Sequence, residues 1–141
     1  MRELDDVTGL IVDSAVRIHR ELGSGLLESV YELVLERELA RRGLKVERQK
    51  PICFSYDELV FENAFRVDML VDERVVVEIK SVERLAPVHY KQLLTYLRLM
   101  NLPVGLLINF SGTTLKEGLR RVVNQLPPSA SPRLRVNQSS R

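Results

Sequence analysis

The segment from Arg66 to Lys80 constrains the fold of this chain more than any other, because it predicts a hairpin of two β-strands. Two short runs rich in valine and other apolar residues flank the polar group Asp72-Glu73-Arg74, as in two strands joined by a turn. The second run ends in Glu78-Ile79-Lys80. Because side chains alternate between the faces of a strand, Glu78 and Lys80 should point the same way, roughly 7 Å apart at about 3.3 Å of rise per residue.

The first strand of this hairpin carries a second acidic residue, Asp68. The alternation places Arg66 and Asp68 on one face, and it places three apolar residues on the other: Phe65, Val67 and Met69. A carboxylate on one strand can therefore meet a carboxylate and an ammonium on its neighbour. Such a group is either a functional site or the salt-bridged end of a sheet.

Two carboxylates and a lysine in this arrangement suit metal-assisted attack on a phosphodiester. Hard divalent cations such as Mg²⁺ take oxygen ligands, usually from one or two carboxylates together with water and substrate phosphate. The cation lowers the pKa of a bound water and neutralises charge that builds on the phosphate, and a lysine can hold the water or the phosphate. The pattern D-x(9)-E-x-K is short, however, and charges at strand ends are usually solvated. The pattern alone leaves both interpretations open.

Length and charge limit the kind of protein this can be. With 141 residues, of which 45% are hydrophobic, the chain is long enough for one domain with a buried core. The net charge is +2, but segment 126–141 contains three arginines and no acid, which leaves 18 basic and 19 acidic residues elsewhere. A general nucleic-acid binder normally has a stronger basic footprint. Global charge therefore gives nucleic-acid binding no support, although a local basic patch formed by Arg41-Arg42, Lys45 and Arg48 stays open.

Cysteine content and hydrophobic stretches indicate which disulfides, metal sites and cellular compartment to expect. Cys53 is the only cysteine, which excludes an intrachain disulfide and a cysteine-based zinc site. No stretch reaches the roughly 18 apolar residues of a membrane span. The N-terminus has four acidic residues among its first thirteen and no long apolar region, so we do not expect a signal peptide. A cytoplasmic protein without membrane contact is the default expectation.

The order of helical and strand patterns predicts an α/β fold. Apolar residues at helical spacing predict helices over 4–21 and 26–42, with glycines near their ends. Alternation predicts a strand over 44–56 with a break at Pro51, then a turn at Asp57-Glu58 and a short strand over 59–61. A third helix should begin at Pro87, a strand covered on both faces should span 103–110, and a last helix should span 115–123.

These elements favour a mixed sheet. Strands that follow one another directly favour an antiparallel meander. The strand over 103–110 follows a helix and is expected to lie parallel to 75–79. Segment 126–141 is rich in proline and serine and predicts a flexible tail, so the folded domain should span 1–125.

Several polar residues have both a structural and a functional interpretation. Glu28 lies in the first turn of its helix, where a carboxylate interacts favourably with the helix dipole. Gln92 follows the Glu-x-Lys strand and could lie against its end, but spacing alone favours a solvated side chain. His19 and His89 are expected to be ordinary polar helix residues rather than ligands, although His89 could reach a phosphate.

Four blocks of the sequence together resemble a known family. They are the run from Leu22 to Tyr31 with its Gly25 and Glu28, then Asp68, then Glu78-Ile79-Lys80, and then the run from Pro87 to Leu97 with its Gln92. In this order and spacing they resemble the GxxExxY family, a small-domain branch of the PD-(D/E)XK nuclease superfamily, from about residue 10 to residue 123. The proline that usually precedes the aspartate is replaced by Val67.

The resemblance implies a restriction-endonuclease-like α/β core, with a mixed sheet of four or five strands between helices. It implies a site at the open end of the central hairpin, where Asp68 and Glu78 bind Mg²⁺ or Mn²⁺ and the Ile79 carbonyl is a further candidate ligand. It also implies three other roles: a water held by Glu28, a nucleophile oriented by Lys80 and a substrate positioned by Gln92.

Two functions are consistent with these residues. The first is a divalent-metal-dependent nuclease, with DNA favoured over RNA as substrate. The second is a non-catalytic interaction module of the same fold, acting as a homodimer or with a partner protein. In the second case the carboxylates would form internal ion pairs, and the near-neutral charge of the domain motivates this alternative. Fold alone does not decide between them.

Overall fold

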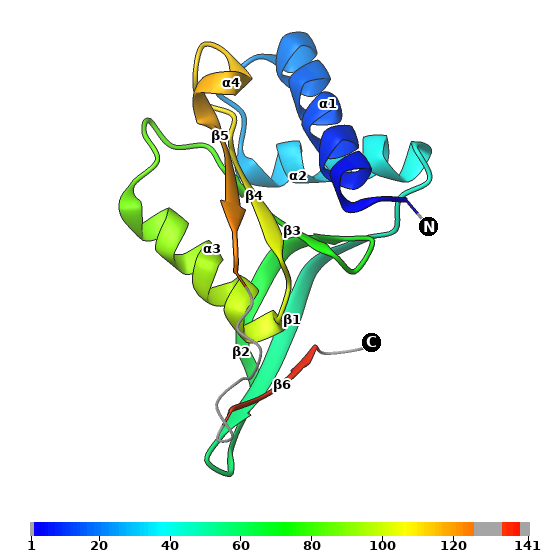
Figure 1. Cartoon of the computed structure of the whole chain (residues 1–141). Coiled ribbons are helices and arrows are strands. Elements are labelled where there is room, and N and C mark those ends of the chain that lie inside the picture. The colour runs from blue at the N-terminus through cyan, green and yellow to red at the C-terminus, as the bar shows by residue number, and fades with distance from the viewer. Residues whose placement is uncertain (1, 126–133, 139–141) are drawn as a thin grey trace.

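The computed structural model describes residues 2–125 and 134–138, and these form a mixed sheet flanked by helices (Figure 1). Strands β1 (Val46–Tyr56), β2 (Leu59–Val71) and β3 (Val75–Lys80) run antiparallel in sequence order. The predicted hairpin is therefore confirmed. Its turn at Asp72-Glu73 has φ values of 51° and 58°, as in the tight turns that match the twist of antiparallel strands.

The other strands extend this meander on both sides. Strand β4 (Val104–Asn109) is parallel to β3, and β5 (Leu119–Val123) is antiparallel to β4. Strand β6 (Leu134–Gln138) pairs with β1, so the order across the sheet is β5-β4-β3-β2-β1-β6. The α/β class and the parallel pairing of β3 with β4 were both predicted and are confirmed.

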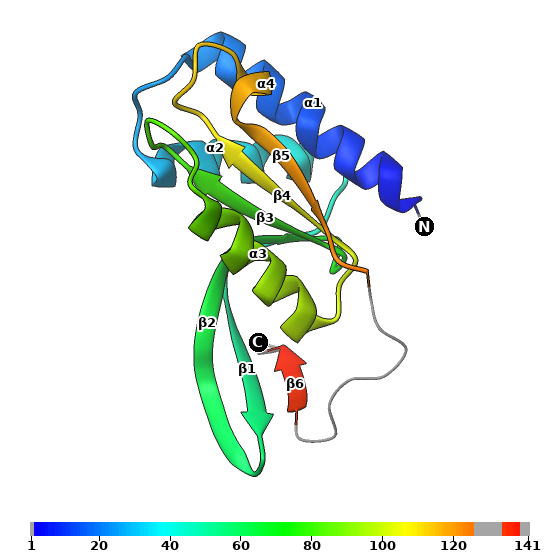
Figure 2. The same ribbon diagram turned by 60° about the vertical axis from the view of Figure 1, so that its left-hand side comes forward.

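Helices cover both faces of the sheet. Helices α1 (Leu4–Leu22) and α2 (Glu28–Arg41) pack on one face, and α3 (Pro87–Met100) packs on the other (Figure 2). A fourth helix, α4 (Leu115–Gly118), is only one turn long. In both views the β1–β2 hairpin projects beyond the helical layers.

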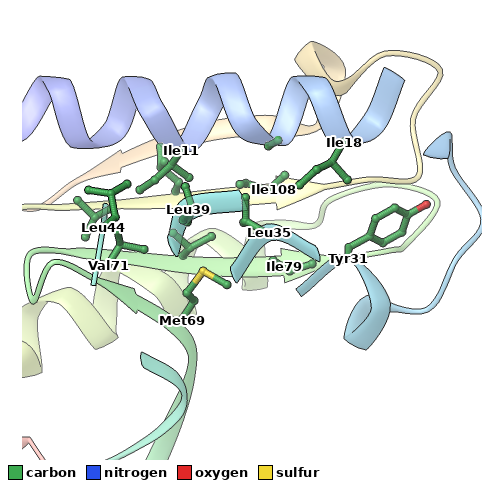
Figure 3. Packing of buried hydrophobic residues seen from close by; sticks show 14 of the residues in the cluster. Ile11, Ile18, Tyr31, Leu35, Leu39, Leu44, Met69, Val71, Ile79 and Ile108 are labelled. Carbon is green, nitrogen blue, oxygen red and sulfur yellow. The ribbon is translucent and has the colours of Figure 1, made fainter. Parts of the chain in front are cut away.

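The larger core lies between the sheet and helices α1 and α2. Every residue labelled in Figure 3 belongs to it, and most of its members come from the apolar stripes of the two helices and from alternate positions of β2, β3 and β4. Its largest fully buried side chains include Ile11, Tyr31, Leu35, Leu39 and Ile79. This layer fixes α2 against β3, which is the contact that the candidate site depends on.

The smaller core lies between the sheet and α3. Leu93 and Leu97 of the helix are fully buried against residues of the opposite sheet face, among them Leu70 and Leu107. Gly105 in β4 allows this approach, because a Cβ there would lie 2.9 Å from Leu93 Cδ1. Helix α3 is thereby held across β3 and β4, with its first turns near the end of β3.

The expectation of a helix over 115–123 is wrong after its first turn. Helix α4 covers only Leu115–Gly118, and the chain continues as β5. The reason lies at Gly118, where a Cβ would lie 2.9 Å from the Asn109 Cβ and would overlap the Asn109 carbonyl oxygen. Only glycine allows the chain to pass this close to β4 and then to pair with it.

The expected break at Pro51 is also wrong, since β1 is continuous from Val46 to Tyr56. Its irregularities lie elsewhere, at Gln49, where φ is 49°, and at a register shift between Ile52 and Phe54. The predicted turn at 57–58 is confirmed, and the short strand expected over 59–61 is the beginning of the much longer β2.

The segment expected to be a flexible tail contains a strand. Residues 134–138 pair antiparallel with residues 52–56 and cover the outer edge of β1. A strand of this kind is stabilised by main-chain hydrogen bonds to an exposed sheet edge. Because these bonds do not depend on the side chains, the amino-acid composition does not reveal the strand. Residues 126–133 and 139–141 lie outside the described residues, and the domain boundary at 125 stays a prediction.

Candidate active site

Strands β2 and β3 separate at the residues that the sequence analysis selected. Their ladder ends with the pairing of Met69 and Val77. Beyond it, the Asp68 amide donates to Glu78 Oε2 at 2.8 Å, and the Ile79 amide donates to Asp68 Oδ2 at 2.8 Å. Two side-chain carboxylates thus replace backbone carbonyls as acceptors at the point where the strands part.

The faces of β2 reverse at Asp68. Val67 and Leu70 both belong to the core under α3, whereas Met69 belongs to the core under α1 and α2. The expectation that Phe65, Val67 and Met69 share one face is therefore wrong for Met69. The reason is that the β1–β2 ladder passes over Asp68, so the regular alternation of side chains is lost there.

Helix α2 brings two further carboxylates to this end of the hairpin. Glu28 Oε2 accepts a hydrogen bond of 3.0 Å from the amide of Ser81, the residue after β3. Glu32 is buried, and its two oxygens accept from Arg48 Nη1 at 3.1 Å and from Gln49 Nε2 at 2.7 Å. Both glutamates line a pocket of about 260 Å³, together with Ser29, Gln49, Asp68 and Ile79.

Tyr31 holds the loop that leads into α2. Its hydroxyl donates to the Gly23 carbonyl at 2.6 Å and accepts from the Leu26 amide at 3.2 Å. Its buried ring stacks on Phe110, with 4.3 Å between the ring centroids. Gly25 in this loop has a φ of 102°, which favours glycine. The loop is thereby fixed, and with it the start of the helix that carries Glu28.

Burial changes the protonation of the carboxylates. Glu78 is 4% exposed, and burial, followed by the charge of Asp68, raises its pKa from 4.5 to about 8. Burial also raises the pKa of Asp68, against the hydrogen bond from the Ile79 amide and the charge of Lys80. The pKa of Glu32 is raised as well, mainly by burial. A buried carboxyl group with a raised pKa keeps its proton, and a bound cation can take the place of that proton and stabilise the carboxylate.

Of the lysine and the glutamine predicted for the site, the lysine lies beside the carboxylates and the glutamine is exposed on α3. Lys80 is half-buried beside Asp68 and Glu78, since its charge lowers the pKa of both. Gln92 is exposed on α3, and it is not among the described residues that line the pocket. Tyr96, one turn further along α3, lies close enough that the charges of Glu78 and Asp68 add to burial in raising its pKa.

Two residues near the site were missed from the sequence, Glu32 and Gln49, while Tyr96 is a helical neighbour of Gln92 to which sequence analysis assigns no role. Glu32 follows Glu28 by four residues, so helical spacing could have identified it. Gln49 gives no such signal, because its position depends on a positive φ inside a strand.

The two histidines have structural partners, as expected of ordinary helix residues. His19 is buried, and its Nε2 lies 2.9 Å from the Gly112 carbonyl oxygen. His89 Nδ1 accepts from the Ala86 amide at 3.0 Å and so caps the start of α3.

The donors at the site suit a hard divalent cation. Glu28, Asp68 and Glu78 offer carboxylate oxygens, which Mg²⁺ and Mn²⁺ prefer. Asp68 and Glu78 each use one oxygen for a backbone amide, so the second oxygen of each is the candidate ligand. Within residues 2–125 and 134–138, no group of three or more histidine, cysteine, aspartate and glutamate side chains is arranged to hold a metal ion. The donor chemistry fits the ion, although the side chains are not gathered around one point.

The structure thus places Asp68 and the Glu-x-Lys pair at the open central hairpin of a mixed sheet between helices. A family model of the PD-(D/E)XK nuclease superfamily matches residues 5–122. The chain belongs to this superfamily, and this membership supports a nuclease-type function in general. Nucleases of the superfamily generally use divalent metals. No match was found among curated proteins or among solved structures. None of the helices in the described part of the chain is long and apolar enough to cross a membrane.

Proposed function

We propose that this protein is a divalent-metal-dependent nuclease, with Mg²⁺ or Mn²⁺ as its cofactor and DNA favoured over RNA as its substrate. The observation that supports this best is the meeting of Asp68, Glu78 and Lys80 where β2 and β3 separate. Within the superfamily we also propose the GxxExxY branch, because its motif residues shape the loop beside this site. A cytoplasmic location is part of the same proposal.

Each residue has a separate part in hydrolysis. Asp68, Glu78 and the Ile79 carbonyl hold the cation, which supplies neutralisation of phosphate charge and a lowered pKa for water. Glu28 lines the pocket and holds the attacking water through its carboxylate. Lys80 orients this nucleophile, because its ammonium is a compact charge on a flexible stem. Gln92, on the exposed side of α3, positions the substrate.

The direct test is cleavage of labelled DNA and RNA by the purified protein, with millimolar Mg²⁺ or Mn²⁺ and with EDTA. Lys80→Ala and Asp68→Asn should each lower the rate by roughly 100-fold or more, the usual contribution of a positioned catalytic group. Lys116→Ala is the matched control, since Lys116 is an exposed lysine of α4, outside the β2–β3 hairpin. It should cleave at the wild-type rate.

Thermal unfolding of each variant shows whether the fold is intact. An unchanged rate in Lys80→Ala would contradict the role given to this lysine. Cleavage that persists in EDTA would contradict metal dependence.

A non-catalytic interaction module is the second candidate, and one observation favours it. Leu27, Val30 and Leu33 are 72%, 37% and 49% exposed on and beside α2, and clustered apolar side chains on a surface often mark an interface. A homodimer or a partner protein would cover them. Asp68 and Glu78 would then serve only as acceptors for backbone amides. A Tm measurement with and without Mg²⁺ or Mn²⁺ distinguishes the two functions. An ion that binds the folded nuclease should raise its Tm, whereas the Tm of an interaction module without a cation site should not change.

A further inference from the structure

Gln49 has an unusual backbone conformation for a residue inside a strand. It lies within β1, yet its φ is 49°, in the left-handed region that residues other than glycine rarely adopt. The β1–β2 ladder pairs the residue before it with Met69 and the residue after it with Val67, and it passes over Gln49 and Asp68. A strained conformation of this kind persists only where the surrounding contacts hold it.

The side chain of Gln49 makes those contacts. Its Nε2 donates to Glu32 Oε1 at 2.7 Å. The side chain also lies beside Asp68, in the same pocket and at the facing position of β2, and it lowers the pKa of Asp68, as expected of an amide that donates toward a charged carboxylate. An amide nitrogen carries two hydrogens, so one neutral group can serve a carboxylate on α2 and another on β2. All three residues line the same pocket of about 260 Å³.

The bridge matters because the two carboxylates repel each other. The charge of Asp68 acts to raise the pKa of Glu32, after the larger effect of burial. Arg48 Nη1 donates to Glu32 Oε2 at 3.1 Å, so Glu32 is held at both oxygens. The Ile79 amide donates to Asp68 Oδ2, and the Gln49 side chain acts on the same carboxyl group. Gln49 therefore ties the orientation of Asp68 to a carboxylate that is itself fixed.

We propose that Gln49 is a positioning residue of the cation site, whose amide links Asp68 to Glu32 and sets the orientation in which Asp68 binds the divalent ion. This inference rests on the proposed metal-dependent function and adds to it a residue of β1. The competing interpretation is that Gln49 only shapes the strand. Glycine accepts a positive φ more readily than glutamine, so in that case removal of the side chain would ease the backbone and change nothing else.

Gln49→Gly separates these interpretations, because it removes the amide and relieves the backbone together. An alanine variant would keep the backbone strain and confuse the two effects. Asn101→Gly is the matched control, since Asn101 ends α3 with a φ of 57° and is exposed outside the pocket. The measurements are the Kd of Mn²⁺ by titration calorimetry and the Tm in EDTA, for the wild type and both variants. Neither measurement depends on cleavage.

We expect Asn101→Gly to keep or raise the Tm in EDTA, and Gln49→Gly to stay folded in EDTA, because relief of the backbone offsets part of the lost bond to Glu32. Only Gln49→Gly should bind Mn²⁺ more weakly, by about 10- to 100-fold, as is usual when a group that orients a metal ligand is lost. Equal Mn²⁺ affinity in the wild type and Gln49→Gly would overturn the inference and leave the proposed function standing. An equal loss in both variants would also overturn it, because relief of the backbone would then be the cause. A wild type that binds no Mn²⁺ would refute the proposed function and the inference with it.

Discussion

Asp68 and Glu78 are joined across the end of the β2–β3 ladder, because the Asp68 amide donates to Glu78 Oε2 at 2.8 Å. The acids proposed to bind a cation are thus also acceptors that complete the sheet. A buried amide left without a partner destabilises a protein by about 1–3 kcal/mol. Variants that keep an oxygen acceptor, such as Asp68→Asn and Glu78→Gln, therefore test the chemistry of the site with less damage to the fold than alanine.

Glu78→Gln should make the protein more stable at high pH. Burial raises the Glu78 pKa from 4.5 to about 8, so between these values the folded protein keeps a proton that the unfolded chain releases. The stability from that proton is full below pH 4.5 and is lost as the pH rises through about 8. We expect the gain of the variant over the wild type to grow by on the order of 4 kcal/mol between about pH 5 and about pH 9. Urea unfolding in EDTA measures the gain.

Glu83→Gln is the matched control for this experiment, because Glu83 is exposed in the loop after β3. Its unfolding free energy should follow the wild type at every pH. If Glu78→Gln also follows the wild type, Glu78 titrates normally in the folded protein and the argument from burial is wrong.

Tyr31→Phe should destabilise the protein by about 1–2 kcal/mol. It removes the hydrogen bonds to Gly23 and Leu26, while the ring keeps its stacking on Phe110. Tyr56→Phe is the control, since Tyr56 is exposed at the end of β1, and it should change the unfolding free energy by less than about 0.5 kcal/mol. Similar losses in urea unfolding of the two variants would show that the Tyr31 hydroxyl does not hold the loop.

Gly118→Ala and Gly9→Ala should shift stability in opposite directions. A Cβ at Gly118 would overlap the Asn109 backbone, so we expect a loss of about 1–3 kcal/mol, the range for overpacking. Gly9 lies exposed in α1, and a Cβ added there would have nothing within 4 Å, so alanine at this position should add about 0.5–1 kcal/mol. Thermal unfolding compares the two variants directly. A Gly118→Ala protein as stable as the wild type would show that β5 can move away from β4.

The parts of the fold that could be predicted are those whose signals are local. Alternation and a polar turn lie together in the segment from Arg66 to Lys80, and the helix between β3 and β4 implies their parallel pairing. Strand β5 could not be predicted in this way. Its apolar residues fit helical spacing too, and the choice is made by the close approach of Gly118 to Asn109, which is a contact between segments.

The residues of the candidate site also differ in whether local sequence signals could predict them. Asp68, Glu78 and Lys80 lie on neighbouring strands of one hairpin, so their spacing alone predicts that they meet. Gln49 lines the pocket in a left-handed backbone conformation, and contacts between β1, β2 and α2 hold it there. Such a conformation has no counterpart in the spacing of residue types, and for this reason sequence analysis supplies the acids but not the group that orients them.

Cation affinity should rise with pH between about 6 and about 8. Below its pKa of about 8, Glu78 must release a proton before its carboxylate can hold an ion, so one displaced proton increases affinity by up to about tenfold per pH unit. In Glu78→Gln no such proton exists, and the affinity should be weaker and nearly independent of pH. Mn²⁺ titrations in buffers of different ionisation enthalpy count the protons released. If the wild type binds Mn²⁺ equally well at both ends of this range, the ion lies away from Glu78, and Asp68 becomes the acid to test next.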